Sequence, residues 1–377
     1  YMQYISLIIS LTSLVISLVS FILNNKRASY TLIDDNYKSL LDTAISNPNF
    51  RNPEITKKYK DYEKKDNSFY NSYCSYAFQV WNFVETVYDF NNTKKEKKQL
   101  IRTWMPILRE ENRLHFNWFA RNTRLFKNEF VYFVYHELNG FEIKKGSEED
   151  LSFIIDSYIK SFPEEERKSE EHIRKLINKG EYQVLVASFQ DIDKEDVENV
   201  GYALVRIDYK SKLMFLDYVN VFEEYQSKGI GGVILESLFD NKVHKSGNVD
   251  AVIFEIEKAE GKPFKSQEAR RRRFYLNHGA RDLHVKDYGI PTKSGGKLPL
   301  DLMILPHYRS TFIKSDKIKK FVFASECAIH SDFTHTKDVI NSYINNIDSF
   351  VKDSINSIVS FFSIIICWLW CRTSINK

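Results

Sequence analysis

Three of the chain's 13 glycines fall within four positions, at Gly229, Gly231 and Gly232, in the stretch "YQSKGIGG". Glycine has no Cβ atom, so it adopts backbone angles that other residues resist and lets an anion approach main-chain N–H groups. If a helix starts here, its first turn adds unpaired N–H groups and a partial positive charge. The pattern is suited to holding a phosphate group, and a plain tight turn is the alternative interpretation.

The elements that must position this turn lie on either side of it. The run "LMFLDYVNV", residues 213–221, is apolar and β-branched, which is typical of a strand. The run "VILESLFDNKV" after the glycines has the apolar spacing of a helix with one buried face. No Gly-Lys-Ser/Thr of a Walker loop is present, and no third glycine completes a dinucleotide fingerprint.

The motif in this stretch resembles a known family. "VNVFEEYQSKGIGGVILESLF" is similar to the central motif of the GNAT superfamily of N-acetyltransferases, Gln/Arg-x-x-Gly-x-Gly/Ala after a strand. Here the motif residues are Gln226, Gly229 and Gly231. The resemblance covers residues from about 140 to 306, and the order of predicted strands and helices in that range fits the family's fold.

Two further stretches agree with this resemblance. "RRRFYLNHGA" places Tyr275 shortly before Gly279, as in a later helix of the family, and "SFPEEER" at 161–167 matches an acidic loop of many bacterial members. Two positions depart from the pattern. Ala280 stands where phenylalanine commonly follows the glycine, and Glu268 stands where asparagine is often found.

The resemblance implies acetyl-CoA as co-substrate and no metal. Main-chain N–H groups of the glycine turn would hold the pyrophosphate, and the end of the preceding strand would bond the pantetheine arm and the thioester carbonyl. The residues implied at the cofactor are Val219, Val221, Gln226, Ser227, Lys228, Gly229, Ile230, Gly231 and Gly232.

Direct acetyl transfer needs a base, because an ammonium cannot attack a thioester until it loses a proton. The candidate bases are Asp217, Glu255 and Glu257, with Glu255 the first choice; strand alternation puts both glutamates on one face. Each could equally be a surface carboxylate. A backbone N–H near Val221 would stabilise the oxyanion. By resemblance Tyr275 protonates the leaving thiolate, and simple packing is the alternative for Tyr275.

Charge and cysteine content exclude other classes. A net charge of +4 does not indicate a nucleic-acid-binding protein. "RRRR" at 270–273 covers a full helical turn, so one or two of these arginines could reach the CoA 3′-phosphate or an acidic substrate while the rest are solvated. The 4 cysteines are scattered and lack zinc spacing, which favours a reducing compartment and no structural metal.

Two apolar runs bear on membrane attachment. Residues 5–23 form a run of 19 uncharged residues followed by Lys26 and Arg27, which favours an uncleaved anchor with the remainder in the cytoplasm over a signal peptide. Its serines share one side of a helix, which either supports a homo-oligomer or is simply tolerated. The second run, 354–371, could span, re-enter or lie at the interface.

These observations predict an α+β (mixed α/β) fold with a GNAT-like central mixed sheet flanked by helices. Aromatic residues at helical spacing before it indicate a packed bundle; a ligand box around His115, Trp118 and Phe119 is the alternative. The predicted organisation is 1–27 anchor, 28–139 helical domain, 140–306 acetyltransferase domain, 307–353 polar connector and 354–377 possible second membrane segment.

The sequence as a whole predicts a membrane-anchored N-acetyltransferase whose catalytic domain faces the cytoplasm. It would transfer an acetyl group from acetyl-CoA to a primary amine by direct attack in a ternary complex. The alternative is a non-catalytic acyl-CoA-binding membrane signalling or scaffold protein, because fold resemblance alone does not separate the two. The partners expected are an amine acceptor and the lipid bilayer, and no nucleic acid.

Overall fold

The computed structural model describes residues 31–90, 94–162, 167–190, 197–240, 249–292 and 295–351. Contacts divide the chain into two units, 1–139 with Ser227–Gly229, and 140–226 with 230–377. The predicted membrane runs at 5–23 and 354–371 lie outside the described residues, as does most of the acidic loop at 161–167. Within the described ranges, no helix combines the length and hydropathy that a membrane crossing requires.

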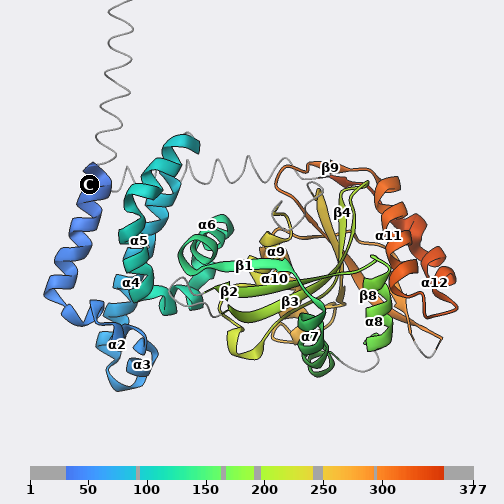
Figure 1. The fold of residues 1–377 in the computed structure, drawn as a ribbon, viewed down its shortest axis with the longest axis horizontal. Coiled ribbons are helices and arrows are strands. Elements are labelled where there is room, and N and C mark those ends of the chain that lie inside the picture. The colour runs from blue at the N-terminus through green and yellow to red at the C-terminus, as the bar shows by residue number, and fades with distance from the viewer. Residues whose placement is uncertain are drawn as a thin grey trace, which may run out of the picture. The chain divides into compact units, whose positions relative to one another are not determined.

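The first unit is built from helices. Two long ones, α4 and α5, run side by side (Figure 1) and are joined by short turns to the remaining elements. The elements are a helix over 31–46, η1 Pro48–Arg51, α2 Pro53–Thr56, η2 Tyr59–Asp61, α3 Tyr62–Lys65, α4 Asn67–Asp89, α5 Lys94–Asn122, η3 Thr123–Leu125, α6 Asn128–Phe133 and the π-helix η4 Val134–Leu138.

Aromatic packing holds α4 against α5. The side chain of Asp66 caps α4 by accepting the N–H of Phe69. From there the helix buries one stripe, and the ring of Trp81 lies 4.1 Å from that of Phe119 on α5, centroid to centroid. Trp118 and Phe119 are buried in this contact, as the packed-bundle interpretation predicts.

The centre of the bundle also holds a buried histidine. His115 is fully buried, its Nδ1 lies 3.0 Å from the Tyr73 hydroxyl, and burial lowers its pKa to about 3. One turn earlier, the buried Glu111 accepts hydrogen bonds from Tyr37 and Arg51. These partners give His115 a structural role in the bundle. In the same unit, Tyr135 donates a hydrogen bond to the carbonyl of Lys228.

The second unit is a mixed sheet. The strand order is β1-β2-β3-β4-β5-β8-β6, β7 also pairs with β8, and every pairing is antiparallel except β4–β5. The strands are β1 Phe141–Lys145, β2 Gln183–Gln190, β3 Val197–Asp208, β4 Leu213–Val221, β5 Ala251–Glu257, β6 Arg281–Asp282, β7 Gly289–Pro291 and β8 Lys297–Pro306. The predicted mixed α/β fold is confirmed for this unit.

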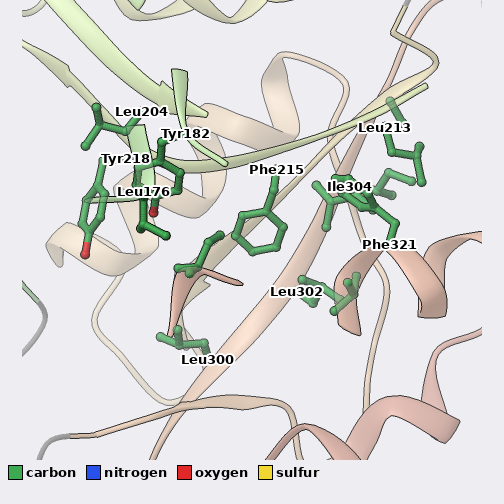
Figure 2. Close-up of a cluster of buried hydrophobic side chains, with 14 of the residues drawn as sticks. Leu176, Tyr182, Leu204, Leu213, Phe215, Tyr218, Leu300, Leu302, Ile304 and Phe321 are labelled. Atoms are coloured by element: carbon green, nitrogen blue, oxygen red, sulfur yellow. The ribbon is translucent and has the colours of Figure 1, made fainter. Parts of the chain in front are cut away.

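Helices flank this sheet. Ser147 and Asp150 form a capping box that starts α7, and the Ser169 and Ser266 side chains cap α8 and α10. Strand side chains such as Phe215 and Leu302 converge with Leu176 of α8 and Phe321 (Figure 2). The helical elements are α7 Glu148–Ser161, α8 Glu170–Asn178, η6 Glu223–Tyr225, α9 Ile230–Ser237 and α10 Gln267–Asn277.

Residues 307–351 differ from the polar connector that the sequence predicted. They form β9 Phe312–Ile313, α11 Ser315–Ile329, α12 Thr336–Tyr343, η7 Ile344–Asn346 and β10 Phe350–Val351. Ile318, Phe321 and Ile340 belong to the same buried cluster as the sheet, and Figure 2 draws Phe321 among the sheet side chains. Its apolar residues complete the core together with a few buried polar ones such as Glu326, so this segment is part of the second unit.

Candidate functional site

The only parallel pair in the described sheet opens into a fork. β4 and β5 are paired over Leu213–Leu216 and Ala251–Phe254. Both strands continue beyond this ladder, β4 to Val221 and β5 to Glu257. The first residues past the last pair are Asp217 and Glu255, two of the three candidate bases. The fold therefore places both carboxylates at the point where the strands separate.

A β-bulge fixes the direction of Asp217. In the β3–β4 ladder, Leu204 faces Tyr218 and Val205 faces Leu216, so Asp217 is the extra residue. Its carboxylate lies 2.9 Å from the Lys168 ammonium and accepts a hydrogen bond from Tyr182. Lys168 is buried; burial opposes its charge, but the carboxylate of Asp217 prevails and raises the pKa of Lys168. Asp217 is therefore held in an ion pair.

The main chain of β4 beyond the fork has polar groups directed away from β3. The N–H of Phe222 donates to the carbonyl of Val200 on β3 at 3.0 Å. Because successive N–H groups in a strand point to opposite sides, Val221 and Val219 direct theirs to the side where β5 has diverged. The Val221 carbonyl already accepts the side-chain amide of Gln226 at 2.9 Å. The two N–H groups remain suited to hydrogen bonding with an extended ligand.

The glycine turn has the backbone conformation that anion binding requires. Ser227 and Gly229 both have positive φ, 60° and 79°, and α9 begins at Ile230. Alternating right- and left-handed residues turn successive N–H groups toward one side, and the first turn of α9 adds N–H groups without acceptors in their own helix. The resemblance places the N–H group of Gln226 at the pyrophosphate. In the structure this N–H instead donates to the Glu223 carbonyl at 3.2 Å.

Two of the three glycines are needed for helix packing. A Cβ atom at Gly232 would overlap Nε2 of His278, the residue that directly follows α10. A Cβ atom at Gly231 would lie 3.2 Å from the ring of Phe274 on α10. The sequence predicts that these glycines give an anion access to the main chain, with a plain tight turn as the alternative. In the structure, only Gly229 has an angle that calls for glycine, while Gly231 and Gly232 let α9 and α10 approach closely.

His278 was not predicted from the sequence. Its Nδ1 lies 2.8 Å from the Phe274 carbonyl, and burial lowers its pKa, so the ring is neutral with the Nδ1 hydrogen donated to that carbonyl. Its other nitrogen faces the start of α9. No spacing rule identifies such a residue, because the contact depends on how the two helices pack.

Tyr275 and Glu255 lie on opposite faces of the sheet. Tyr275 is buried, and its ring lies 4.3 Å from that of Phe254, centroid to centroid. Phe254 and Glu255 are consecutive strand residues, so their side chains point to opposite faces. Burial raises the pKa of Tyr275 to about 12, so the phenol keeps its proton at neutral pH.

The two candidate glutamates of β5 have different partners. Glu255 contacts the hydroxyl of Tyr288, and burial followed by the neighbouring Glu326 raises its pKa well above the usual range. Glu257 forms an ion pair with Arg271 of α10. An ion-paired carboxylate is a poor proton acceptor, so Glu255 is the better base of the two.

The four arginines of α10 are mostly engaged within the unit. Arg271 pairs with Glu257, and Arg272 bonds Asp282 and Asp301. The Arg273 guanidinium lies 3.8 Å from the centroid of the Phe264 ring. Arg270 is exposed. The prediction that all but one or two of these arginines are simply solvated therefore holds for Arg270, whereas Arg271 and Arg272 are partly exposed but held in ion pairs. In the described part of the chain, no group of three His, Cys, Asp or Glu residues is placed to hold a metal ion.

Comparison with known proteins gives partial structural matches. No family model and no curated protein matches the chain. Among solved structures, part of it is similar to the ribosomal-protein-S18-alanine N-acetyltransferase from Escherichia coli, with 19% identity, a TM-score of 0.31, and coverage of 44% of this chain and 93% of that chain. It is also similar to Arabidopsis thaliana NAA60 in complex with acetyl-CoA, with 16% identity, a TM-score of 0.32, and coverage of 44% and 98%. An acetyltransferase of the GNAT family from Desulfovibrio desulfuricans matches with 16% identity, a TM-score of 0.31, and coverage of 44% and 98%.

Proposed function

We propose that residues 140–351, with the glycine turn they include, form an acetyl-CoA-dependent N-acetyltransferase that acts on a primary amine by direct attack in a ternary complex. The observation that carries this proposal is the fork between β4 and β5. At the fork, carboxylates occupy one face, a protonated buried tyrosine occupies the other, and the glycine turn follows the end of β4.

The residues at the fork fit the proposed co-substrate. Acetyl-CoA supplies the acetyl group as a thioester. The positive φ angles of Ser227 and Gly229 and the start of α9 direct N–H groups that can hold its pyrophosphate. The N–H groups of Val219 and Val221 can bond an extended arm lying along β4. The residues that would hold it are Val219, Val221, Ser227, Lys228, Gly229, Ile230, Gly231 and Gly232.

The proton transfers that the reaction requires determine the role of each side chain. An ammonium that becomes an amide gives up two protons, one before attack and one as the product forms. Glu255, on the face away from Tyr275, takes a proton from the amine. Tyr275, kept protonated by burial, donates its proton to the departing sulfur. The second proton of the nitrogen leaves to water as the tetrahedral intermediate collapses, and the Tyr275 phenolate regains a proton from water. The N–H of Val221 stabilises the negative charge that develops on the carbonyl oxygen.

The test is thiol release from acetyl-CoA by the full chain over a panel of amines, with CoA binding measured by calorimetry. Gly229→Glu is expected to abolish binding, because a Cβ atom there would lie 2.7 Å from the Thr123 side chain at a φ of 79°, which distorts the turn that presents the N–H groups. Tyr275→Phe is expected to lower turnover by about 10²-fold or more while binding is retained. Saturable binding without thiol release over the whole panel would instead favour the non-catalytic acyl-CoA sensor.

We also propose that residues 5–23 anchor the chain in a membrane with the following residues in the cytoplasm, on the charge pattern alone. Alkaline extraction of membranes should retain the full chain and release a variant lacking 1–27. Replacing the five serines of this run with leucine should lower crosslinking between copies if the serine side is a helix contact. Unchanged crosslinking would contradict the oligomer.

A further inference from the structure

One buried hydroxyl lies between two carboxyl groups. The Tyr288 hydroxyl contacts Oε1 of Glu255 on β5 and lies 2.7 Å from Oε1 of Glu326 on α11. Burial, followed by the two carboxyls, raises the pKa of Tyr288, so the hydroxyl keeps its hydrogen. A tyrosine hydroxyl has one hydrogen and can donate to only one carboxylate. The other contact is favourable only when that carboxyl carries a proton and donates to the Tyr288 oxygen.

The surroundings do not supply a cation for a second negative charge. Lys168, which faces this cluster, is paired with Asp217 at 2.9 Å. His330 lies 3.2 Å from Oε2 of Glu326, but burial lowers the pKa of His330 to about 4 and leaves the ring neutral at pH 7. The titratable groups that face the two carboxyls are Lys168, Asp217, Tyr288, His330 and Tyr343.

Two buried polar atoms also favour a proton on one of the two carboxyl groups. Among the described residues, Oε2 of Glu326 and Nδ1 of His330 have no hydrogen-bond partner. Glu326 is fully buried. A buried carboxylate with an unpartnered oxygen is costly in the ionised form, whereas a proton shared within the pair removes one of the two charges.

We propose that α11 completes the proton-accepting site, with Glu326 and Tyr288 as positioning residues that make Glu255 hold a shared proton. This inference rests on the proposed acetyltransferase function. Glu255 must first release the shared proton to solvent. The ionised carboxylate then takes a proton from the acceptor ammonium, the N–H electron pair stays on nitrogen for attack, and the pair again holds one proton. Glu326 therefore sets the pH above which Glu255 acts as a base.

The pH profile of kcat/KM separates this role from a purely structural one. Glu326→Gln removes the repelling charge and offers an amide N–H to Glu255. The midpoint of the acid limb should move down by about one pH unit or more. Asp316→Asn is the matched control, because Asp316 is an exposed carboxylate on the same helix, and it should leave the midpoint unchanged. A uniform loss of activity without a shift in midpoint overturns the proposal.

A second readout does not depend on turnover. Infrared spectra of the full chain at neutral pH should show the carbonyl stretch of an un-ionised carboxyl. This band should vanish in Glu255→Gln and in Glu326→Gln, persist in Asp316→Asn, and shift in Tyr288→Phe. A wild-type spectrum without the band overturns the proposal even if the chain is an active acetyltransferase. A band with this mutational pattern supports the shared proton even if no acceptor amine is found.

Discussion

The two units contain the same short motif in different electrostatic surroundings. Glu111 and His115 on α5, and Glu326 on α11 with His330 directly after that helix, are each a buried glutamate followed four residues later by a buried histidine. Glu111 has a cation, Arg51, at 2.5 Å, whereas Glu326 has a second carboxyl group across the Tyr288 hydroxyl. Burial raises the pKa of both glutamates, and Arg51 opposes that rise at Glu111, whereas Glu326 has a second carboxyl group beside it.

The largest expected effect on stability comes from breaking the Arg51–Glu111 ion pair. Arg51→Met leaves Glu111 buried without its cation and should lower the free energy of unfolding of the first unit by about 3 kcal/mol at pH 7. Chemical denaturation followed by a probe in that unit measures it. Lys60→Met is the control, since the Lys60–Glu63 pair is exposed and its loss should cost about 0.5 kcal/mol or less. Equal effects would contradict the comparison.

The two histidines should behave alike despite the different glutamates. Burial lowers the pKa of His115 to about 3 and that of His330 to about 4, below the unfolded value. The unfolded state therefore binds the proton first, and stability is lost as the pH falls below about 6.5. Each histidine should account for about 2 kcal/mol of the loss between pH 7 and pH 5.

Replacing either histidine with glutamine should remove its share of this pH dependence, whatever the pH-independent cost of the substitution. Unfolding curves at several pH values measure the slope for each unit. Slopes that match the wild type would show that the histidine is charged in the folded state.

The glutamate pair of the second unit should have the opposite pH dependence. Burial and the neighbouring carboxyl raise the pKa of Glu255, so its stability contribution is complete below the unfolded value and is lost as the pH rises through the folded one. Glu326→Gln should reduce the loss between pH 5 and pH 8 by about 1–2 kcal/mol. Asp316→Asn should not change it. A Glu326→Gln variant whose stability has the same pH dependence as that of the wild type would contradict the shared proton.

Much of the local structure was predictable from the sequence. The strand predicted at 213–221 has those bounds, and the helix predicted after the glycines is α9, Ile230–Ser237. These features depend on residues close together in the chain, where alternation and capping rules apply. The glycine turn is also local, and its left-handed Gly229 follows from the same reasoning.

What was not predictable depends on contacts between distant residues. The place where β4 leaves β5 depends on how far their ladder extends, and the bulge at Asp217 is visible only in the pairing with β3. Glu326 follows Glu255 by 71 positions, so no periodicity joins them. The packing reason for Gly231 and Gly232 likewise needs α10 in place.

The apolar residues of α11 and α12 have a practical consequence for dissecting the protein. A fragment that ended at Pro306 would leave the sheet side chains around Leu302 and Ile304 open to water, although strands and glycine turn were all present. Such a fragment should aggregate or be degraded, and its inactivity would not test the proposed acetyltransferase activity of the full chain. A useful truncation must run past Phe350, where the last buried side chain of that face is supplied.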